Sequence, residues 1–327
     1  MIIDGHSHIG NEKFNNRAEI KLDDYINFIN KVGIDKGLIM PVPCPIVPSN
    51  CNGLNEGKTL LTWKYNGAKH IFLSEVEQLQ NRGLVNPYKE INDYYYSLIK
   101  DHHLDTRMIF VPIIHPILDT DEYLEELILT MNPVAVKIHS VGTACSPLEI
   151  RKSYTAILNE YDVPVIVHTD YNNGNFNKNK GVYEAVKKAE ATMWFDYFEK
   201  HKIRGTLNHG ATLNLDVFDK VNNSRFVRVG IEPSIYFGSN YGRLNIDKKI
   251  FDDLGFLKTL KKYLSSSKLI FDVDYDYNRT LGQELDYDVV NRIYDIWGND
   301  AEDILSSNAL DQYPILRKKW GVLIWKH

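Results

Sequence analysis

Short apolar runs rich in valine and isoleucine recur along the chain and alternate with longer segments of helical periodicity. This alternation predicts βα units around a parallel sheet, because strands buried on both faces are apolar throughout. The eight runs occupy residues 1–3, 37–42, 108–114, 134–138, 163–167, 205–208, 226–231 and 269–273. Eight such strands predict an α/β protein with a closed (β/α)8 TIM barrel.

The helices between these runs are indicated by apolar residues at spacings of three and four. The residues that show this spacing most clearly are Leu22, Ile26 and Ile29, then Leu148, Tyr154, Ile157 and Leu158, and finally Val289, Ile293 and Ile296. Gly298 is predicted to end the last of these helices.

Two connections are much longer than the usual loop of two to six residues between a strand and a helix. The first, 43–86, is expected to be a lid or insertion within a single domain spanning 1–327. The second, 170–181, is rich in Asn, Gly and Lys and is expected to be an exposed loop. Both follow the carboxyl ends of strands, where barrel enzymes build their sites, so residues 43–67 and 170–181 are expected to supply the pocket walls.

Composition narrows the class of protein. The 327 residues are 43% hydrophobic and 25% charged, which is typical of a globular domain, and no stretch approaches the roughly 18 apolar residues of a membrane span. The chain opens on an apolar strand instead of a basic signal region, so we expect a cytoplasmic protein. A net charge of −5 disfavours nucleic acid and leaves a small molecule as the expected partner. Cys44, Cys51 and Cys145 are too irregularly spaced for a disulfide framework.

Polar residues interrupt the first strand in a regular way. The chain begins MIIDGHSHIG, and residues two apart on a strand share a face, so Asp4, His6 and His8 are expected to project to one side. Two imidazoles spaced in this way can supply two ligands to zinc or a similar divalent ion. Alone, the pair is weak evidence, because two histidines in this spacing also occur at surfaces.

Other strands end in residues of the same chemical types. His168 follows PVIV, His209 follows GTLN, and Asp272 and Asp274 lie in KLIFDVDYDY. A single histidine after an apolar run is usually a core residue bonded to a carbonyl. The repetition of metal-ligating residue types at successive strand ends favours a metal site over packing.

Four motifs resemble those of the amidohydrolase superfamily, in the branch that includes aminocarboxymuconate semialdehyde decarboxylase and other aromatic-acid decarboxylases. IDGHSH is similar to the opening metal motif of that branch, AVKIHS to its fourth-strand pattern, HGA to its sixth-strand His-Gly-Gly, and FDVDY to its eighth-strand Gly-Ser-Asp-Tyr. The likeness extends from the first strand to the last helices. It implies a TIM barrel with a metal-dependent activity.

The resemblance also implies roles for individual residues. It would make His6, His8, His168 and Asp274 the ligands of one divalent ion, Zn²⁺ or Mn²⁺, with His209 as the acid/base beside it. Two departures stand out. Asp272 and Asp276 replace a glycine and a proline of the last motif, which keeps Asp272 open as the carboxylate ligand, and Ala211 replaces the second glycine of the sixth-strand motif.

Lys137 and His139 share a strand face and are expected to enter the barrel as substrate-binding residues. In binuclear relatives a carboxylated lysine on the fourth strand bridges two metal ions, and Lys137 could take that part. The VKIH pattern resembles the mononuclear branch instead. A third interpretation makes Lys137 a buried cation paired with Asp272 or Glu232.

Three functions are compatible with these residues. The first is hydrolysis of a small amide, ester or lactone by a metal-activated water, with Asp274 orienting or deprotonating that water and His209 assisting the carbonyl or leaving group. The second is non-oxidative decarboxylation of an aromatic or unsaturated acid. The third is a non-catalytic binding protein on the same barrel. A homodimer is one assembly that the exposed helices and the C-terminal Trp320, Ile324 and Trp325 would allow.

Overall fold

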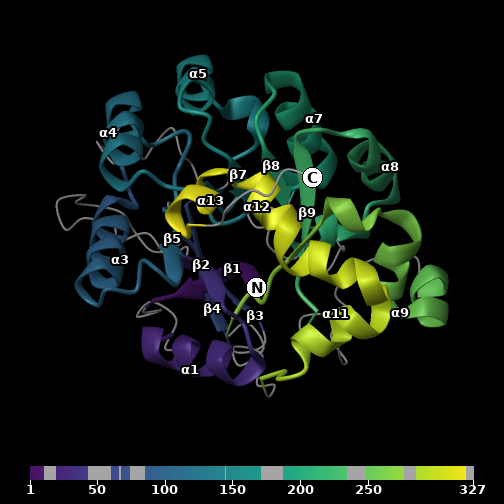
Figure 1. The fold of residues 1–327 in the computed structure, drawn as a ribbon. Helices are drawn as coiled ribbons and strands as arrows, with labels where there is room; N and C mark the ends of the chain where they lie inside the picture. Colours follow the sequence, from purple (N-terminus) through teal and green to yellow (C-terminus); the bar gives the residue numbers. More distant parts are fainter. Residues whose placement is uncertain are drawn as a thin grey trace.

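A computed structural model describes the parts of the chain that form the barrel. The described residues are 1–10, 20–42, 60–65, 68–73, 85–143, 145–170, 187–233, 248–275 and 285–321. Within them, eight parallel strands are surrounded by helices (Figure 1). The barrel strands are β1 (Ile3–Ile9), β2 (Lys36–Pro41), β5 (Met108–Phe110), β6 (Val136–Ile138), β7 (Val165–Val167), β8 (Gly205–Leu207), β9 (Val227–Ile231) and β10 (Leu269–Phe271).

The strands form two sheets that join edge to edge. One sheet has the order β1-β2-β5 and the other β10-β9-β8-β7-β6, with parallel pairing throughout. A parallel bridge between Ile113 and Lys137 connects β5 to β6. On the opposite side, the Asp274 amide donates to the His6 carbonyl at 2.8 Å and connects β10 to β1. The sheet therefore closes, and the predicted (β/α)8 barrel is confirmed.

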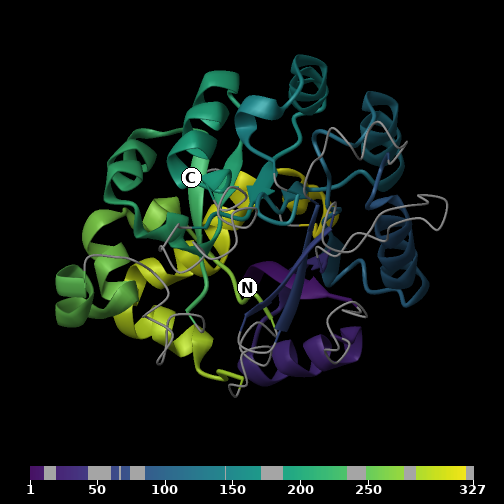
Figure 2. The ribbon, with the colours of Figure 1, turned by 180° about the vertical axis from the view of Figure 1, so that it is seen from behind.

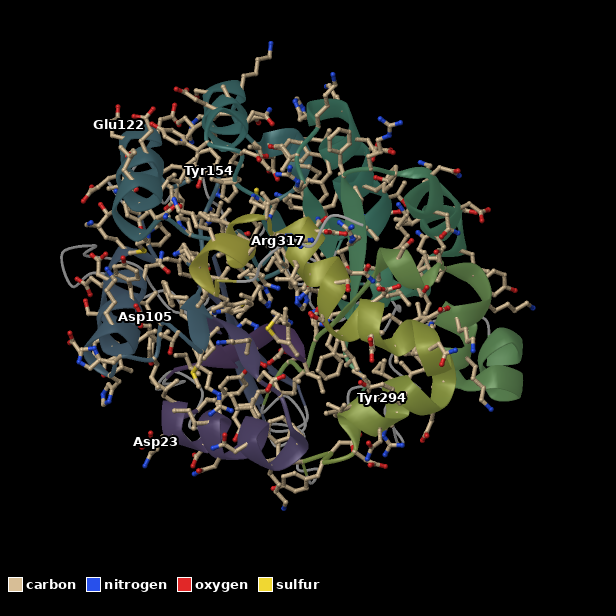
Figure 3. All side chains as sticks on the ribbon, viewed as in Figure 1. Asp23, Asp105, Glu122, Tyr154, Tyr294 and Arg317 are labelled. Carbon is tan, nitrogen blue, oxygen red and sulfur yellow. The ribbon has the colours of Figure 1, made fainter. Side chains whose placement is uncertain are left out.

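Amphipathic helices cover the outside of the barrel. They are α1 (Leu22–Val32), α3 (Lys89–Asp101), α4 (Asp121–Met131), α5 (Lys152–Glu160), α7 (Ala191–His201), α8 (Leu215–Asn223), α9 (Lys248–Tyr263) and α11 (Val289–Trp297). Figure 3 shows Tyr154 between α5 and the strands, whereas Asp23 and Glu122 point outward. Two boundaries show the expected chemistry: the Thr120 side chain accepts from the Tyr123 amide at the start of α4, and Gly33 ends α1 in the left-handed region.

Two short C-terminal helices close the amino-terminal end of the barrel. They are α12 (Asn308–Gln312) and α13 (Ile315–Lys319), which lie across the centre of the ring in Figure 1 and behind it in Figure 2. Leu310, Tyr313 and Leu316 are buried there against strand residues such as Ile3 and Leu38. The hydroxyls of Tyr313 and Thr206 are 2.7 Å apart. This apolar floor leaves the opposite end of the barrel, at the carboxyl ends of the strands, for polar residues.

Several details differ from the sequence-based expectations. Only Ile3 of the apolar run 1–3 lies in β1, which continues to Ile9 through the polar residues, as expected for a strand that carries His6 and His8. Leu148 lies outside α5 in a short 3-10 helix and is 84% exposed, so it is not part of the buried face predicted for that helix. Trp320 packs against the floor of the barrel. Ile324 and Trp325 lie outside the described residues.

The segment 43–86 contains an antiparallel hairpin that the sequence analysis missed. Its strands are β3 (Leu60–Tyr65) and β4 (Ala68–Leu73), paired from Leu60 with Leu73 to Tyr65 with Ala68. The two intervening residues are Asn66-Gly67, a dipeptide strongly associated with two-residue hairpins. Most of 43–86 and of the predicted loop 170–181 lies outside the described residues, so the lid and the single-domain organisation stay predictions.

In the described parts of the chain, no helix has the length and apolar composition needed to cross a membrane. Cys145 is buried with a free thiol, and burial raises the pKa of that thiol above its usual range. Cys44 and Cys51 lie outside the described residues.

The floor of the barrel can be tested by removing one of its side chains. Leu316 is fully buried, so we expect Leu316→Ala to lower the free energy of unfolding by about 2–5 kcal/mol. Leu129, 67% exposed on α4, is the matched control, and Leu129→Ala should change that free energy by less than about 0.5 kcal/mol. Urea denaturation would measure both, and equal effects would mean that α13 does not seal the barrel.

Candidate metal centre

A register shift in the first strand decides which of its side chains enter the barrel. The pairing of β1 with β2 is irregular between Asp4 and Ser7. Asp4 contacts the Tyr25 hydroxyl of α1, outside the barrel, whereas the rings of His6 and His8 meet with their Nε2 atoms 3.1 Å apart. The predicted shared face is therefore right for the two histidines and wrong for Asp4, because an irregular strand does not keep the period of two.

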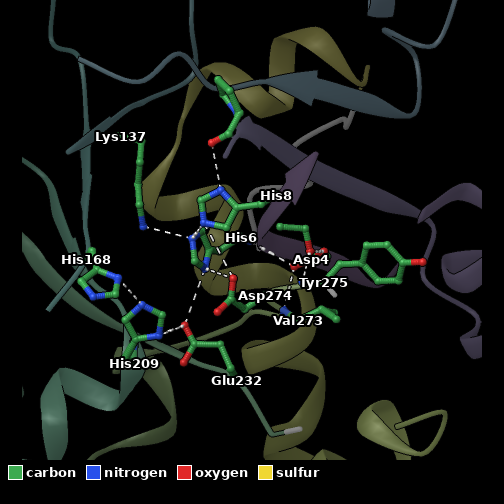
Figure 4. A network of polar contacts seen from close by, with 12 residues as sticks. Asp4, His6, His8, Lys137, His168, His209, Glu232, Val273, Asp274 and Tyr275 are labelled. Atoms are coloured by element: carbon green, nitrogen blue, oxygen red, sulfur yellow. Dashed lines mark hydrogen bonds and ion pairs between the residues drawn. The ribbon is translucent and has the colours of Figure 1, made fainter. Parts of the chain in front are cut away.

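Asp4 instead joins the first strand to the last. Its Oδ1 accepts from the amides of His6 (3.1 Å) and Val273 (2.9 Å) (Figure 4). Its Oδ2 accepts from the hydroxyls of Ser7 (2.5 Å) and Tyr25 (2.7 Å). Burial raises the pKa of Asp4 to about 6, although these hydrogen bonds act in the opposite direction. The network fixes the end of β1 beside the end of β10.

His6, His8 and Asp274 form a cluster, called here the upper cluster, in which one ligand atom of each lies within 4.8 Å of the others. The Asp274 Oδ1 atom is 3.8 Å from His8 Nε2 and 3.9 Å from His6 Nδ1. Burial raises the pKa of Asp274 to about 7, with His209 opposing this rise and Glu232 adding to it. Burial also lowers the pKa of His8 to about 3 and that of His6 well below its usual value. Both imidazoles are therefore neutral, the form that binds metal ions.

The tautomer of His8 is set by a backbone carbonyl. His8 Nδ1 lies 3.0 Å from the Pro41 oxygen, and because a carbonyl can only accept, Nδ1 carries the proton. The lone pair of the ring is left on Nε2, the atom that faces His6. Such an outer hydrogen bond is the usual way of orienting a metal-binding histidine.

Glu232, at the end of β9, is a site residue that the sequence analysis did not place there. Its Oε1 atom accepts from the His209 amide at 3.1 Å and lies 3.3 Å from His209 Nδ1. Burial lowers the pKa of His209, but Glu232 and Asp274 outweigh burial and raise it above its usual value. On the other side of the ring, His209 Nε2 is 2.7 Å from His168 Nδ1. Glu232 could have been found as a carboxylate that directly follows the strand FVRVGI.

The backbone that carries His209 is strained. From His209 to Leu213 every residue has a positive φ, between 46° and 59°, so the chain forms a left-handed turn directly after β8. Each non-glycine residue in that region costs about 1–3 kcal/mol. Ala211, with φ of 46°, occupies the position of the second glycine in the His-Gly-Gly motif that the sequence resembles. Glycine suits this position because it adopts a positive φ without steric cost. Asp274 also has a positive φ, 51°.

Lys137 and His139 both enter the barrel, as predicted. Lys137 is fully buried, with Nζ 3.0 Å from His6 Nε2. Burial lowers the pKa of Lys137 to about 8 even though three nearby carboxylates act in the opposite direction. The His139 ring stacks on that of His168 at 4.0 Å, and the Gly142 amide donates to His139 Nδ1 at 2.9 Å. The neutral His139 ring therefore carries its proton on Nε2.

Of the four predicted ligands, the structure brings His6, His8 and Asp274 together. His168 lies beside them, in contact with His209 and His139, instead of within the upper cluster. Asp272, the alternative carboxylate, is buried with Glu232 on the other side of His6. The geometry thus separates the two aspartates, with Asp274 alone next to both histidines of the first strand.

Comparison with known proteins yields likeness in structure alone. No protein-family model and no curated protein sequence matches the chain. A dihydroxybenzoic acid decarboxylase from a Polaromonas species, with bound manganese and the inhibitor 2-nitroresorcinol, matches with a TM-score of 0.60 at 10% identity, over 98% of this chain and 99% of that one. A probable 2-pyrone-4,6-dicarboxylic acid hydrolase from Acinetobacter baumannii, with bound citric acid, matches with a TM-score of 0.57 at 12% identity, over 96% and 99%.

A third similar structure is the 5-carboxyvanillate decarboxylase of Novosphingobium aromaticivorans, in complex with manganese and 4-hydroxy-3-methoxy-5-nitrobenzoic acid. Its TM-score is 0.54 at 10% identity, over 99% of this chain and 96% of that one. The chain therefore shares the fold of these three proteins over nearly its whole length, which agrees with the fold that the motif resemblance implies.

Gly5 tests how closely the first and last strands must approach. A Cβ atom at Gly5 would lie 2.5 Å from Asp272 Oδ1 and 2.8 Å from Ile270 Cγ2. We expect Gly5→Ala to lower the free energy of unfolding by about 3 kcal/mol, the upper end for overpacking. At Gly33 a Cβ meets nothing within 4 Å but φ is 78°, so Gly33→Ala should cost only about 1 kcal/mol. Denaturant unfolding of both variants would measure the difference, and similar costs would show that the strands can separate at Gly5.

Proposed function

We propose that this protein is a metal-dependent hydrolase that acts on a small carbonyl-containing substrate, an amide, ester or lactone. The upper cluster of His6, His8 and Asp274, with the proton-holding His209 next to it, is the observation that carries this proposal. Its residues come from the first, sixth and last barrel strands, at the end of the barrel opposite the apolar floor.

The residues fit a divalent ion. If the Nε2 atoms of His6 and His8 were each about 2.0–2.1 Å from one ion, their separation of 3.1 Å would correspond to an angle of roughly 100° between them. His6 Nδ1 is buried with no hydrogen-bond partner among the described residues. His6, His8 and Asp274 would bind the ion, with His168 as a fourth ligand. Two imidazoles and a carboxylate suit Zn²⁺ and Mn²⁺ alike.

When bound, such an ion lowers the pKa of its water toward about 7 and polarises a carbonyl. Asp274 would orient the attacking water, because its Oδ1 atom lies 3.8 Å from His8 Nε2, next to the place where the ion would bind. His209 would hold a proton at Nε2 for the leaving group, since Glu232 accepts from Nδ1 and raises the pKa of the ring. Proton transfer of this kind is worth about 10²- to 10⁴-fold in rate.

Lys137 would bind the substrate. The Nε2 atom of His6 has one lone pair, so it cannot both accept from Lys137 and bind an ion. With an ion bound, the Lys137 ammonium is free to meet a carboxylate or carbonyl oxygen of the substrate. A neutral His139 ring, with its proton on Nε2, offers a second donor from the same strand. This use of Lys137 favours one metal ion in the upper cluster over a carboxylated lysine that bridges two.

Non-oxidative decarboxylation of an aromatic or unsaturated acid is the second candidate. It is favoured by the two manganese-containing decarboxylases among the similar structures and by the buried cation of Lys137, which could hold a substrate carboxylate. In that reaction His209 would give its proton to the ring carbon that loses carbon dioxide. A non-catalytic binding protein would not need an acid/base group beside the three candidate ligands.

The proposal is tested by metal content and turnover measured on the same preparation. We expect the Mn²⁺- or Zn²⁺-loaded protein to hydrolyse members of a panel of lactones, esters and amides, and His8→Ala to lose the ion of the upper cluster and this activity together. If the protein instead released carbon dioxide from hydroxylated aromatic acids and hydrolysed nothing, its function would be decarboxylation, the second candidate. A His8→Ala variant with unchanged metal content and turnover would refute the metal mechanism.

His209 is expected to act as an acid/base and not as a ligand. His209→Asn should keep the metal content of the wild type and lower kcat by about 10²- to 10⁴-fold. Elemental analysis and steady-state rates on one preparation separate the two roles. Loss of the ion in this variant would make His209 a ligand instead.

A further inference from the structure

Below the upper cluster lies a second group of buried polar side chains, of which the proposed function uses only one oxygen of Glu232, the one that faces His209. It consists of Asn208, Glu232 and Asp272, called here the lower cluster, each at most 1% exposed. One ligand atom each of His6, Glu232 and Asp272 lies within 4.8 Å of the others. The His6 ring contacts both clusters: Nε2 lies 3.1 Å from His8 Nε2, and Nδ1 lies 3.7 Å from Glu232 Oε1 and 3.9 Å from Asp274 Oδ1.

The lower cluster holds polar atoms that are buried without partners. Both carboxylate oxygens of Asp272, the Oε2 atom of Glu232 and both polar side-chain atoms of Asn208 have no hydrogen-bond partner among the described residues. Asp4 shows the contrast, because its carboxylate accepts from two amides and two hydroxyls. A buried carboxylate without hydrogen bonds or a counter-ion is costly.

The charges nearby do not balance. Four buried carboxyl groups, those of Asp4, Glu232, Asp272 and Asp274, lie near two cationic groups, Lys137 and His209. His209 faces Glu232, and the Lys137 ammonium lies 3.0 Å from His6 Nε2. A divalent ion in the upper cluster would compensate part of this charge next to Asp274. The oxygens of Asp272 would still lack a partner on the far side of His6.

Glycines bring the oxygens of the lower cluster close together. A Cβ atom at Gly230 would clash with Asp272 Oδ2 and would lie 3.2 Å from Asn208 Oδ1. A Cβ atom at Gly5 would lie 2.5 Å from Asp272 Oδ1. Gly5 in β1 and Gly230 in β9 therefore have no side chain where Asp272 enters the barrel. The apolar floor around Tyr313 closes the space below.

We propose that the lower cluster binds a second divalent cation through oxygen atoms of Asn208, Glu232 and Asp272. His6 gives its Nε2 lone pair to the upper cluster, so its neutral ring keeps a proton on Nδ1 that points toward Glu232. The ligands are then all oxygens, which suit Mg²⁺ and Mn²⁺ better than softer ions. This site goes beyond the proposed function, which needs one ion only, in the upper cluster.

Mn²⁺ binding tests the second site directly. The full chain would be stripped with a chelator and titrated with MnCl2 while the electron paramagnetic resonance signal of free Mn²⁺ is followed. We expect about two bound Mn²⁺ per chain for the wild type and about one for Asp272→Asn. The matched control is Asp295→Asn, an exposed aspartate on α11, which should still bind about two. Equal binding by the wild type and Asp272→Asn overturns the proposal.

Two further variants separate this site from the upper cluster. His8→Ala should keep about one Mn²⁺, held by the lower cluster, and complete loss of binding in that variant would overturn the second site. Unchanged binding by His8→Ala would instead count against the proposed function and leave the lower site standing. If Asp272→Asn does not fold, Asn208→Ala replaces it and should weaken binding of the second ion about 10-fold, whereas unchanged affinity would contradict the proposal.

Discussion

The geometry of the site depends on the hydrogen bonds that the Asp4 carboxylate accepts from both ends of the barrel sheet. Asp4 accepts from the amide of His6 in the first barrel strand and from the amide of Val273, just after the last barrel strand. Asp4 and Val273 are 269 positions apart in the sequence. Ser7 extends the same seam, because its hydroxyl donates to Asp4 and accepts from the Tyr275 amide. With Asp4 turned outward to Tyr25, the irregular strand turns His6 and His8 inward, toward Asp274.

Burial then gives these groups their chemistry. Low-dielectric surroundings disfavour charged groups. They therefore lower the pKa values of His6 and His8, which stay neutral, and raise the pKa values of Asp274 and Asp272 above their usual range. His209 is the exception, since Glu232 is close enough to outweigh the cost of burial. The carboxyl end of the barrel therefore holds two kinds of imidazole. Those of His6 and His8 are neutral and can bind a metal ion, whereas that of His209 has a raised pKa and binds a proton more strongly. The buried carboxyl groups beside them would be stabilised by a cation.

The sequence predicts the barrel well because strands buried on both faces are apolar throughout, and each of the eight apolar runs overlaps a barrel strand. It also predicts the residues of the upper cluster, since His6, His8 and Asp274 follow or interrupt such runs. It does not predict the register shift at Asp4, which depends on pairing with a strand from elsewhere in the chain. Glu232 was missed as a site residue for a related reason: its contacts with His209 and His6 arise only when separate strand ends meet. The left-handed turn at His209 is equally a property of tertiary packing, because local preference opposes it.

The closure of the barrel between β1 and β10 also orders events during synthesis. His6 and His8 leave the ribosome well before Asp274 and the floor helices α12 and α13. Until β10 docks, the nascent chain offers two imidazoles without the carboxylate and without the buried surroundings that tune them. Co-translational capture of a metal ion by a half-built barrel is therefore disfavoured, and the selection of the ion is deferred to the completed fold.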